Sequence, residues 1–266
     1  MKLEEACQEA TAIIKAVGVF IRKEAISFDR SLIEKKGFND LVSYVDKEAE
    51  LRLVESLKYV LPEAGFITEE ETLNIQEEEY NWIIDPLDGT TNFTHGLPVF
   101  AISVALQQHG ETVMGIVYEI NRDECFYAWK NGGAFLNGTR ISVSETAALK
   151  DSLIATGFPY TDFGLTPDYL KVLGSFMGKS HGVRRLGSAA VDLAYVAAGR
   201  FEGFFEFNLN AWDVAAGVII VREAGGEVSQ FTAGGDPVFG REIVASNGAI
   251  HAEMLAVIAE FWPKKK

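Results

Sequence analysis

Residues 82–93 of this chain, WIIDPLDGTTNF, restrict the possible fold more than any other segment. The apolar residues at the start of this segment predict a short buried strand, and Pro86 disfavours a helical conformation at Asp85, so we expect the strand to end there. Gly89 permits a sharp turn, and any of the three polar residues after it is suited to begin a helix. The segment therefore predicts a strand, a turn and a helix, with Asp85 and Asp88 near the helix N-terminus.

Two carboxylates near a helix N-terminus suggest a metal–phosphate site. Asp85 and Asp88 would repel each other unless a cation lay between them. A hard divalent ion such as Mg²⁺ takes oxygen ligands, commonly alongside substrate phosphate, and helix N–H groups bind anions. Asp, Pro, Gly and Asn are also ordinary turn residues, so a simple polar turn is the alternative interpretation. Acidic residues of the same kind elsewhere in the chain favour the metal site.

Glu69 and Asp213 are these further acidic candidates. Glu69 directly follows a predicted strand at residues 65–68, and it would lie beside Asp85 if the two strands pair. The acidic residues after Glu69 lead into a polar loop and are expected to be solvated. Asp213 lies in the first turn of a predicted helix at residues 212–224, which is apolar almost all round. The helix dipole alone favours an acid there, but an unpaired buried charge is costly, and a cation shared with the first acidic pair would satisfy it.

Two segments closely resemble the signature motifs of the inositol monophosphatase family. They are DPLDGTTNF at residues 85–93 and WDVAAG at residues 212–217. Other pieces that resemble the family, in the expected order, are GFNDLVSYVD at residues 37–46, Glu69-Glu70, RLGSAA at residues 185–190 and GFFE at residues 203–206. The resemblance extends over essentially the whole chain, and the joint occurrence of both motifs at this separation is a strong signal.

The resemblance implies a set of Mg²⁺ ligands. Glu69, Asp85 and the backbone carbonyl of Leu87 would hold a first ion. Asp85, Asp88 and Asp213 would hold a second ion, and a weaker third ion would lie near Glu69. Two metal ions about 4 Å apart can stabilise the attacking and leaving oxygens of an in-line displacement, and they lower the pKa of bound water.

The resemblance also implies roles in catalysis and substrate binding. Thr90, hydrogen-bonded to Asp46, would orient the attacking water together with Glu69. The amides of Gly89 and Thr90 would bind phosphate at the helix N-terminus. The residues expected to contact the substrate are Asp88, Gly89, Thr90, Ser188, Ala189, Glu206 and Asp213.

The predicted elements differ between the two halves of the chain. Residues 1–150 combine helices at about 3–25 and 45–59 with a run of hairpin-like strands, whereas residues 151–266 alternate strands with helices. The first half is expected to hold strands at 65–68, 82–85, 101–107, 112–119 and 124–129; the second half is expected to hold strands at 152–156, 182–186, 202–206, 227–230 and 242–246 and helices at 166–178, 188–199, 212–224 and 248–261.

This order of elements predicts an α+β half followed by an α/β half in one compact unit. The acidic candidates come from both halves, so the predicted site lies in the cleft between them. The resemblance implies the layered α/β/α/β/α sandwich of the inositol monophosphatase and fructose-1,6-bisphosphatase type, and it implies a homodimer.

Composition restricts the partners and the compartment. The chain has 38 Asp and Glu against 24 Lys and Arg, a formal net charge of −14, so nucleic acid and anionic membranes are poor partners by simple electrostatics. The two cysteines form no motif and suggest reduced thiols in a cytoplasmic protein. The acidic start of the chain lacks the apolar core of a signal peptide, and no apolar run approaches the length of a membrane span.

Together these features favour a Mg²⁺-dependent phosphomonoester hydrolase that uses a metal-activated water for in-line attack. Inositol 1-monophosphate is the leading substrate, and the family resemblance implies inhibition by Li⁺. The same chemistry on fructose 1,6-bisphosphate, a nucleotide 3′-phosphate, NADP or histidinol phosphate stays open. A regulatory role through a protein partner is the non-enzymatic alternative, although such a role alone would not require the full set of acids.

Overall fold

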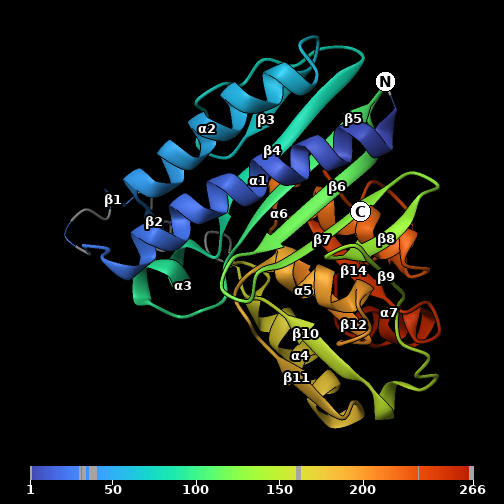
Figure 1. Cartoon of the computed structure of the whole chain (residues 1–266). Coiled ribbons are helices and arrows are strands. Elements are labelled where there is room, and N and C mark those ends of the chain that lie inside the picture. Colours follow the sequence, from blue (N-terminus) through green and yellow to red (C-terminus); the bar gives the residue numbers. More distant parts are fainter. Residues whose placement is uncertain are drawn as a thin grey trace.

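The N-terminal half begins with two long amphipathic helices. The computed structural model describes residues 2–29, 31, 34–35, 41–159, 163–232 and 234–263. In it, α1 (Leu3–Ile26) and α2 (Tyr44–Val60) lie side by side (Figure 1). Apolar residues recur along each helix at helical spacing and are buried. Both helices match the predicted ranges within one residue at each end.

A short antiparallel pair, β1 (Glu34–Lys35) and β2 (Leu41–Val42), lies between the two helices in the chain. Residues 37–40, the first part of the family-like segment at 37–46, lie outside the described residues.

The first sheet follows α2 in the chain. Within the described residues it has seven strands in the order β3-β4-β5-β6-β7-β8-β9. Their bounds are Gly65–Thr68, Tyr80–Asp88, Ala101–Gln108, Glu111–Glu119, Glu124–Trp129, Gly133–Leu136 and Thr139–Ile141. β3 runs parallel to β4, and the other neighbouring pairs are antiparallel. β8 and β9 were not predicted from the sequence, although Asn137 and Gly138 between them, with φ of 47° and 84°, form a typical tight hairpin turn.

The end of β4 differs from the prediction. The strand does not stop at Asp85 but continues to Asp88. Asp85 pairs with Ser103 and Asp88 pairs with Ala101, so β4 contains one residue more than β5 over this stretch. This is a β-bulge, where a strand tolerates proline because one residue is left without a ladder hydrogen bond. The predicted strand end at Asp85 was therefore wrong, because Pro86 excludes a helix there but not a bulged strand.

The second half forms a mixed sheet with helices between the strands. Within the described residues this sheet has five strands in the order β11-β10-β12-β14-β13, in which β10 runs parallel to β11 and β12, and β14 runs antiparallel to β12 and β13. In chain order the elements are a 3₁₀ helix (Leu149–Asp151), β10 (Leu153–Thr156), α4 (Thr166–Lys179), β11 (Gly182–Arg184), α5 (Ala189–Ala197), β12 (Gly203–Phe207), α6 (Ala211–Glu223), β13 (Glu227–Ser229), β14 (Glu242–Ser246) and α7 (His251–Ala259). Apart from the 3₁₀ helix, each of these elements was predicted from the sequence, with ends that differ by at most three residues.

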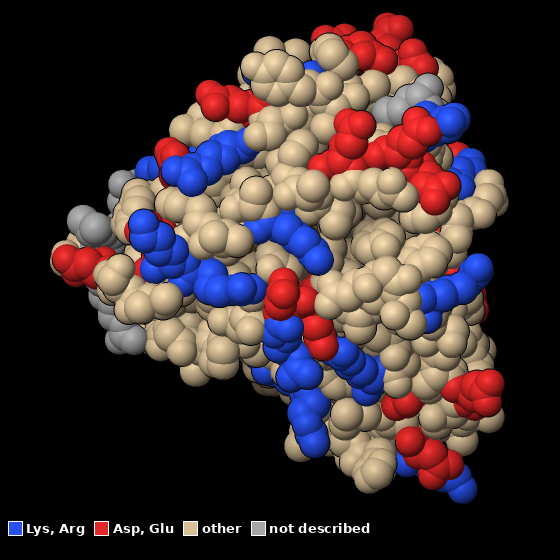
Figure 2. Space-filling model, in the orientation of Figure 1, with Lys and Arg blue, Asp and Glu red and all other residues tan. Residues whose placement is uncertain are grey.

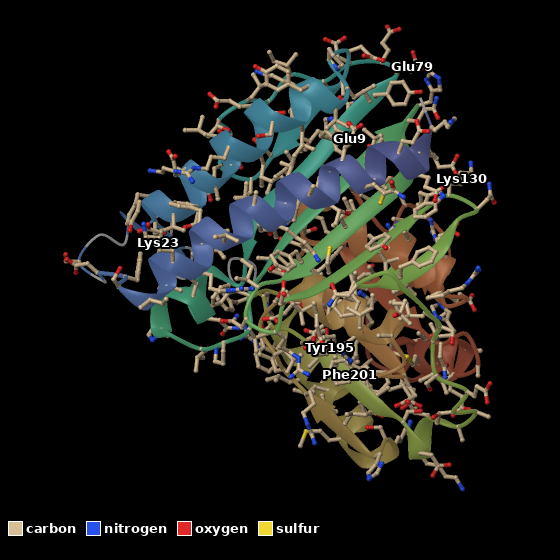
Figure 3. All side chains as sticks on the ribbon, viewed as in Figure 1. Glu9, Lys23, Glu79, Lys130, Tyr195 and Phe201 are labelled. Atoms are coloured by element: carbon tan, nitrogen blue, oxygen red, sulfur yellow. The ribbon has the colours of Figure 1, made fainter. Side chains whose placement is uncertain are left out.

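The elements stack in five layers (Figure 1). α1 and α2 contact one face of the first sheet, α5 and α6 lie between the two sheets, and α4 and α7 contact the second sheet. Three clusters of buried apolar residues fill the spaces between these layers. Side chains occupy the interior throughout (Figure 3), as where the rings of Tyr195 and Phe201 pack with centroids 5.8 Å apart. The α/β/α/β/α sandwich that the resemblance implies is confirmed.

Small residues let α6 approach its neighbours closely. A Cβ atom on Gly115 of β6 would lie 2.6 Å from the Ala216 backbone oxygen, and one on Gly217 would lie 2.5 Å from the Leu193 side chain of α5. α6 is therefore packed directly against the first sheet on one side and against α5 on the other. This packing fixes the position of the first turn of α6, which carries Asp213.

The surface carries charges of both signs. Figure 2 shows acidic groups, basic groups and uncharged areas on one face, with basic groups gathered near its centre, so the net charge of −14 does not form a continuous acidic coat there. Among the helices in the described part of the chain, none combines the length and the hydropathy needed to cross a membrane.

Candidate active site

A cavity of about 360 Å³ opens where the two halves of the chain meet. The residues that line it on the side of the first sheet include Glu69, Asp85, Leu87, Asp88, Gly89 and Thr90. The second half contributes Gly157, Arg185, Ser188, Ala189, Asp192, Glu206, Asp213 and Arg241, among others. Every predicted metal or substrate residue therefore lines this cavity, and of the predicted site residues only Asp46 lies behind it.

Asp85, Asp88 and Asp213 converge on one point of the cavity. One carboxylate oxygen from each lies within 4.8 Å of the others. In a regular strand, Asp85 and Asp88 would point to opposite faces because they are three residues apart. The β-bulge adds one residue between them, so both carboxylates reach the same side.

The local structure of α6 brings Asp213 to this point. The Asp213 Oδ2 atom accepts a hydrogen bond of 2.6 Å from the Asn210 backbone N–H, which completes a capping box at the start of the helix. The Ser103 hydroxyl donates a hydrogen bond of 3.0 Å to the Trp212 carbonyl, so β5 holds the first turn of α6 directly. Asp213 is thus both a first-turn acid, as the alternative interpretation held, and a member of the carboxylate cluster.

Burial raises the pKa values of all three carboxylates, and neighbouring acids add to this effect for Asp85 and Asp213. Burial, followed by the charges of Glu69, Asp88 and Asp213, raises the pKa of Asp85 well above its usual value. Burial raises the pKa of Asp88 to about 6, against the opposing effect of hydrogen bonds from Ser188 and Ala190. Burial and the Asp88 charge raise the pKa of Asp213 to about 7. Clustered oxygen ligands whose ionisation is this unfavourable suit a divalent cation, which would offset their repulsion.

Glu69 lies where strand pairing was expected to place it. Thr68 of β3 pairs with Ile84 of β4, and the Glu69 N–H donates a hydrogen bond of 3.3 Å to the Ile84 carbonyl. The charge of Glu69 raises the pKa of the adjacent Asp85. Among the described residues, the group of three close carboxylates consists of Asp85, Asp88 and Asp213 and does not include Glu69. Glu69 lines the same cavity beside this group.

Thr90 and Asp46 form the hydrogen bond that the resemblance implies. The Thr90 hydroxyl lies 3.0 Å from Asp46 Oδ1 and 3.0 Å from the Leu87 carbonyl. Asp46 is buried, and its other oxygen, Oδ2, accepts hydrogen bonds from the Ser43 backbone and hydroxyl. Burial raises the pKa of Asp46, while the hydrogen bonds from Ser43 and Thr90 lower it. Gly89, with φ of 96°, takes the left-handed conformation that precedes α3 (Thr90–His95).

The opposite wall of the cavity comes from the second half of the chain. The Ser188 hydroxyl and the Ala190 N–H donate hydrogen bonds of 2.6 and 2.7 Å to Asp88 Oδ2. Glu206 is buried on β12, and a Cβ atom on Gly157 would lie 2.1 Å from the Glu206 carboxylate. A side chain at position 157 would therefore displace the Glu206 carboxylate from its place in the cavity. Burial and the charges of Asp213 and Asp88 raise the pKa of Glu206 well above its usual value.

Several residues at the cavity were not identified from the sequence. Asp192 of α5 is buried, lines the cavity, and has an Oδ1 atom without a hydrogen-bond partner. The signal that pointed to Asp213, an acid in the first turn of an apolar helix, applies equally to Asp192. Arg241 and Gly157 also line the cavity, and no pattern in the sequence distinguished them.

Comparison with known proteins identifies the family. The inositol monophosphatase family matches residues 2–263. The chain belongs to this family. The inositol-1-monophosphatase of Rhizobium meliloti is 46% identical to it over 234 residues, 88% of each chain. The Nus factor SuhB of Escherichia coli K12 is 42% identical over 248 residues, 93% of each chain.

The solved structures agree with this assignment. The crystal structure of extragenic suppressor protein suhB from Bartonella henselae has a TM-score of 0.89 and 39% identity, and the match covers 97% of this chain and 98% of that one. Membership of the inositol monophosphatase family supports a phosphatase activity. The names of the relatives divide between a phosphatase and a Nus factor, so family membership by itself does not select a substrate.

Proposed function

We propose that this member of the inositol monophosphatase family is a Mg²⁺-dependent phosphomonoester hydrolase acting on a polyol phosphate, with inositol 1-monophosphate as the leading substrate. The convergence of Asp85, Asp88 and Asp213 in a cavity that Thr90 also lines carries the proposal. Asp85, Asp88, Asp213, Glu69 and the Leu87 carbonyl are the proposed ligands of two or three ions. When bound, Mg²⁺ would neutralise phosphate charge and lower the pKa of water.

The residues of the chain would position the water and the phosphate. The Thr90 hydroxyl donates its proton to Asp46, so its lone pairs are free to accept a hydrogen bond from water. Glu69 would accept the second proton of that water and so direct an oxygen lone pair at phosphorus. The backbone N–H groups of Gly89 and Thr90 would bind the phosphate oxygens at the start of α3. In this arrangement attack is in line and no phosphorylated enzyme forms.

The second half of the chain would bind the alcohol part of the substrate. The Glu206 carboxylate would accept a hydrogen bond from a substrate hydroxyl, and the backbone of Ala189 would contact the ring. Ser188 donates its proton to Asp88, so it would orient that carboxylate and could itself accept from a substrate hydroxyl. The acceptors on this wall would suit the hydroxyls of a polyol, whereas Arg185 and Arg241 on the same wall would suit a second anionic group. Fructose 1,6-bisphosphate, a nucleotide 3′-phosphate, NADP and histidinol phosphate are the alternatives to be compared with the inositol ester.

Phosphate release from inositol 1-phosphate and these four esters tests the proposal. Mg²⁺-dependent turnover that prefers the inositol ester, that EDTA abolishes and that Asp88→Asn eliminates would support both the chemistry and the substrate. Preference for another ester would retain the chemistry and replace the polyol. Equal turnover with EDTA would contradict the role of the metal ion. Because the resemblance implies a homodimer inhibited by Li⁺, the assays include Li⁺ and the mass in solution is measured by light scattering.

A regulatory role through a protein partner is the second candidate. The observation that favours it is the 42% identity to a relative named Nus factor SuhB. The Asp88→Asn variant separates the two candidates in the organism, since a role that depends on a protein partner would survive the substitution. A role that depends on hydrolysis would be lost with turnover.

A further inference from the structure

We propose that Glu50 of α2 is a positioning residue that holds Glu69 in place for metal binding. The inference rests on the proposed function, since it assigns Glu50 a part in building the proposed Mg²⁺ site. Glu50 does not line the cavity and would touch neither substrate nor metal ion. It acts on the segment that follows β3 and carries Glu69.

The carboxylate of Glu50 binds the backbone on the far side of Glu69. Glu50 Oε2 accepts a hydrogen bond of 2.8 Å from the Glu70 N–H. Glu50 Oε1 accepts hydrogen bonds of 2.9 Å from the Thr72 N–H and 2.6 Å from the Thr72 hydroxyl. The side chain of Glu50 is fully buried. Both carboxylate oxygens are therefore used to hold two backbone amides of one short segment.

These contacts complete the restraint on Glu69. On its N-terminal side, Glu69 is fixed by β3 and by its own hydrogen bond to the Ile84 carbonyl of β4. After Glu69 the regular strand has ended, and Glu71 has a φ of 56°, a left-handed conformation that is uncommon for a residue with a side chain. Glu50 holds the backbone there, in addition to the hydrogen bond of 3.2 Å from the Thr68 hydroxyl to the Leu73 carbonyl.

α2 provides this support together with a second carboxylate one turn earlier. Asp46 and Glu50 are four residues apart and share a buried face of the helix. Asp46 accepts the hydrogen bond from Thr90, and Glu50 holds the segment next to Glu69. α2 thus restrains both Thr90 and Glu69, the two residues proposed to orient the attacking water, from the side away from the cavity. The orienting partners of metal ligands are worth about 10- to 100-fold in metal affinity or activity.

The Glu50→Gln variant tests this inference, because it keeps the shape of the side chain. The amide NH₂ would face a backbone N–H in place of an acceptor, so at least one of the hydrogen bonds is lost. Glu202→Gln is the matched control, since Glu202 accepts hydrogen bonds from the Leu153 N–H and the Ser144 hydroxyl but lies at the opposite end of β12 from Glu206. Both variants lose hydrogen bonds of the same kind.

Two readouts besides turnover are measured on the full chain. Calorimetric titration with Mg²⁺ gives metal affinity, and hydrogen exchange gives the opening of the Glu70 and Thr72 amides. For Glu50→Gln we expect the Mg²⁺ dissociation constant to rise about 10- to 100-fold and hydrogen exchange at both amides to become faster. Glu202→Gln should leave Mg²⁺ affinity unchanged.

Several results would overturn the inference. Faster exchange at the two amides with Mg²⁺ affinity within twofold of wild type would make Glu50 a purely structural residue. An equal loss of Mg²⁺ affinity in Glu202→Gln would point to general destabilisation. If Glu50→Gln does not fold, Thr72→Val removes one hydrogen bond alone, and an unchanged Mg²⁺ affinity there would count against the inference. A wild-type protein that binds Mg²⁺ but hydrolyses no ester would contradict the proposed function while leaving the role of Glu50 in metal binding measurable.

Discussion

Replacing Asp213 by Asn should make the metal-free protein more stable near neutral pH, although it removes a proposed metal ligand. Burial and the Asp88 charge raise the pKa of Asp213 from 3.8 to about 7. A rise of about three pKa units corresponds to about 4 kcal/mol of folding free energy. Part of this energy is repulsion shared with Asp88, so we expect the variant to gain about 2 to 4 kcal/mol in free energy of unfolding above pH 7. Asn can still accept the hydrogen bond from Asn210 that Asp213 accepts.

The sign follows from proton binding. Between about pH 4 and pH 7 the folded state keeps a proton on Asp213 that the unfolded state releases. The free energy of unfolding of the metal-free wild type therefore falls as the pH rises through this window, and it stays low above it. The Asn variant lacks this ionisation, so its stability should fall less. Mg²⁺ should restore stability to the wild type by binding the folded state, and it should do so much less for the variant.

Urea unfolding in EDTA at several pH values from 4.5 to 8, repeated with Mg²⁺, measures these differences. Asp168→Asn is the control, because Asp168 is also a first-turn acid, on α4, and pairs with Lys171 on the surface. That substitution should lower stability slightly, by less than about 1 kcal/mol, since it removes only the interaction with the helix dipole and a surface ion pair. If Asp213→Asn also lowered the stability of the metal-free protein near pH 8, Asp213 would be only a first-turn acid and the carboxylate cluster would not store the proposed repulsion.

Three further substitutions test separate parts of the site. Thr90→Ala should lower kcat by about 10²- to 10⁴-fold with Mg²⁺ affinity by calorimetry unchanged, and a loss of metal affinity instead would argue against a role in orienting water. Gly157→Ala would place Cβ 2.1 Å from the Glu206 carboxylate, so KM for inositol 1-phosphate should rise about tenfold while Mg²⁺ still protects against thermal unfolding. Gly115→Ala would place Cβ 2.6 Å from the Ala216 carbonyl oxygen and should cost about 1 to 3 kcal/mol in urea unfolding with EDTA; an unchanged midpoint would show that α6 can shift freely.

Periodicity and turn residues were sufficient to predict most of the helices and strands, whereas the layered sandwich was expected from the family resemblance. The long helices and the strands that are buried on both faces carry repeated apolar positions, so the ranges of α1, α2 and β5 were close to those observed. β8 and β9 are short and partly exposed, so they carry too few apolar residues to show an alternation. The bulge in β4 depends on pairing with β5, a partner that local sequence does not reveal.

Some residues of the candidate site could likewise be predicted from the sequence, and others could not. Asp85, Asp88 and Asp213 could be found because each is an acid next to apolar sequence, where a charge is unexpected. Glu50 could not be found, because it lies among the many charged residues of α2 and its role depends on contacts with amides 20 and 22 positions away. Gly157 also has no local signal, since its importance comes from the side chain of a residue on another strand.

The carboxylates that form the site oppose the folding of the metal-free protein, and the packing of α6 offsets this effect. β4 and α6 carry Asp85, Asp88 and Asp213, of which one carboxylate oxygen each lies within 4.8 Å of the others, and α6 is packed closely against the sheet at Gly115 of β6. A looser core would let the carboxylates move apart and lose both their repulsion and their affinity for a cation. On the proposed function, the dense apolar layer around α5 and α6 would keep three acids at a spacing that a bound cation makes favourable. Metal affinity in this protein should accordingly depend on core packing as well as on the ligands themselves.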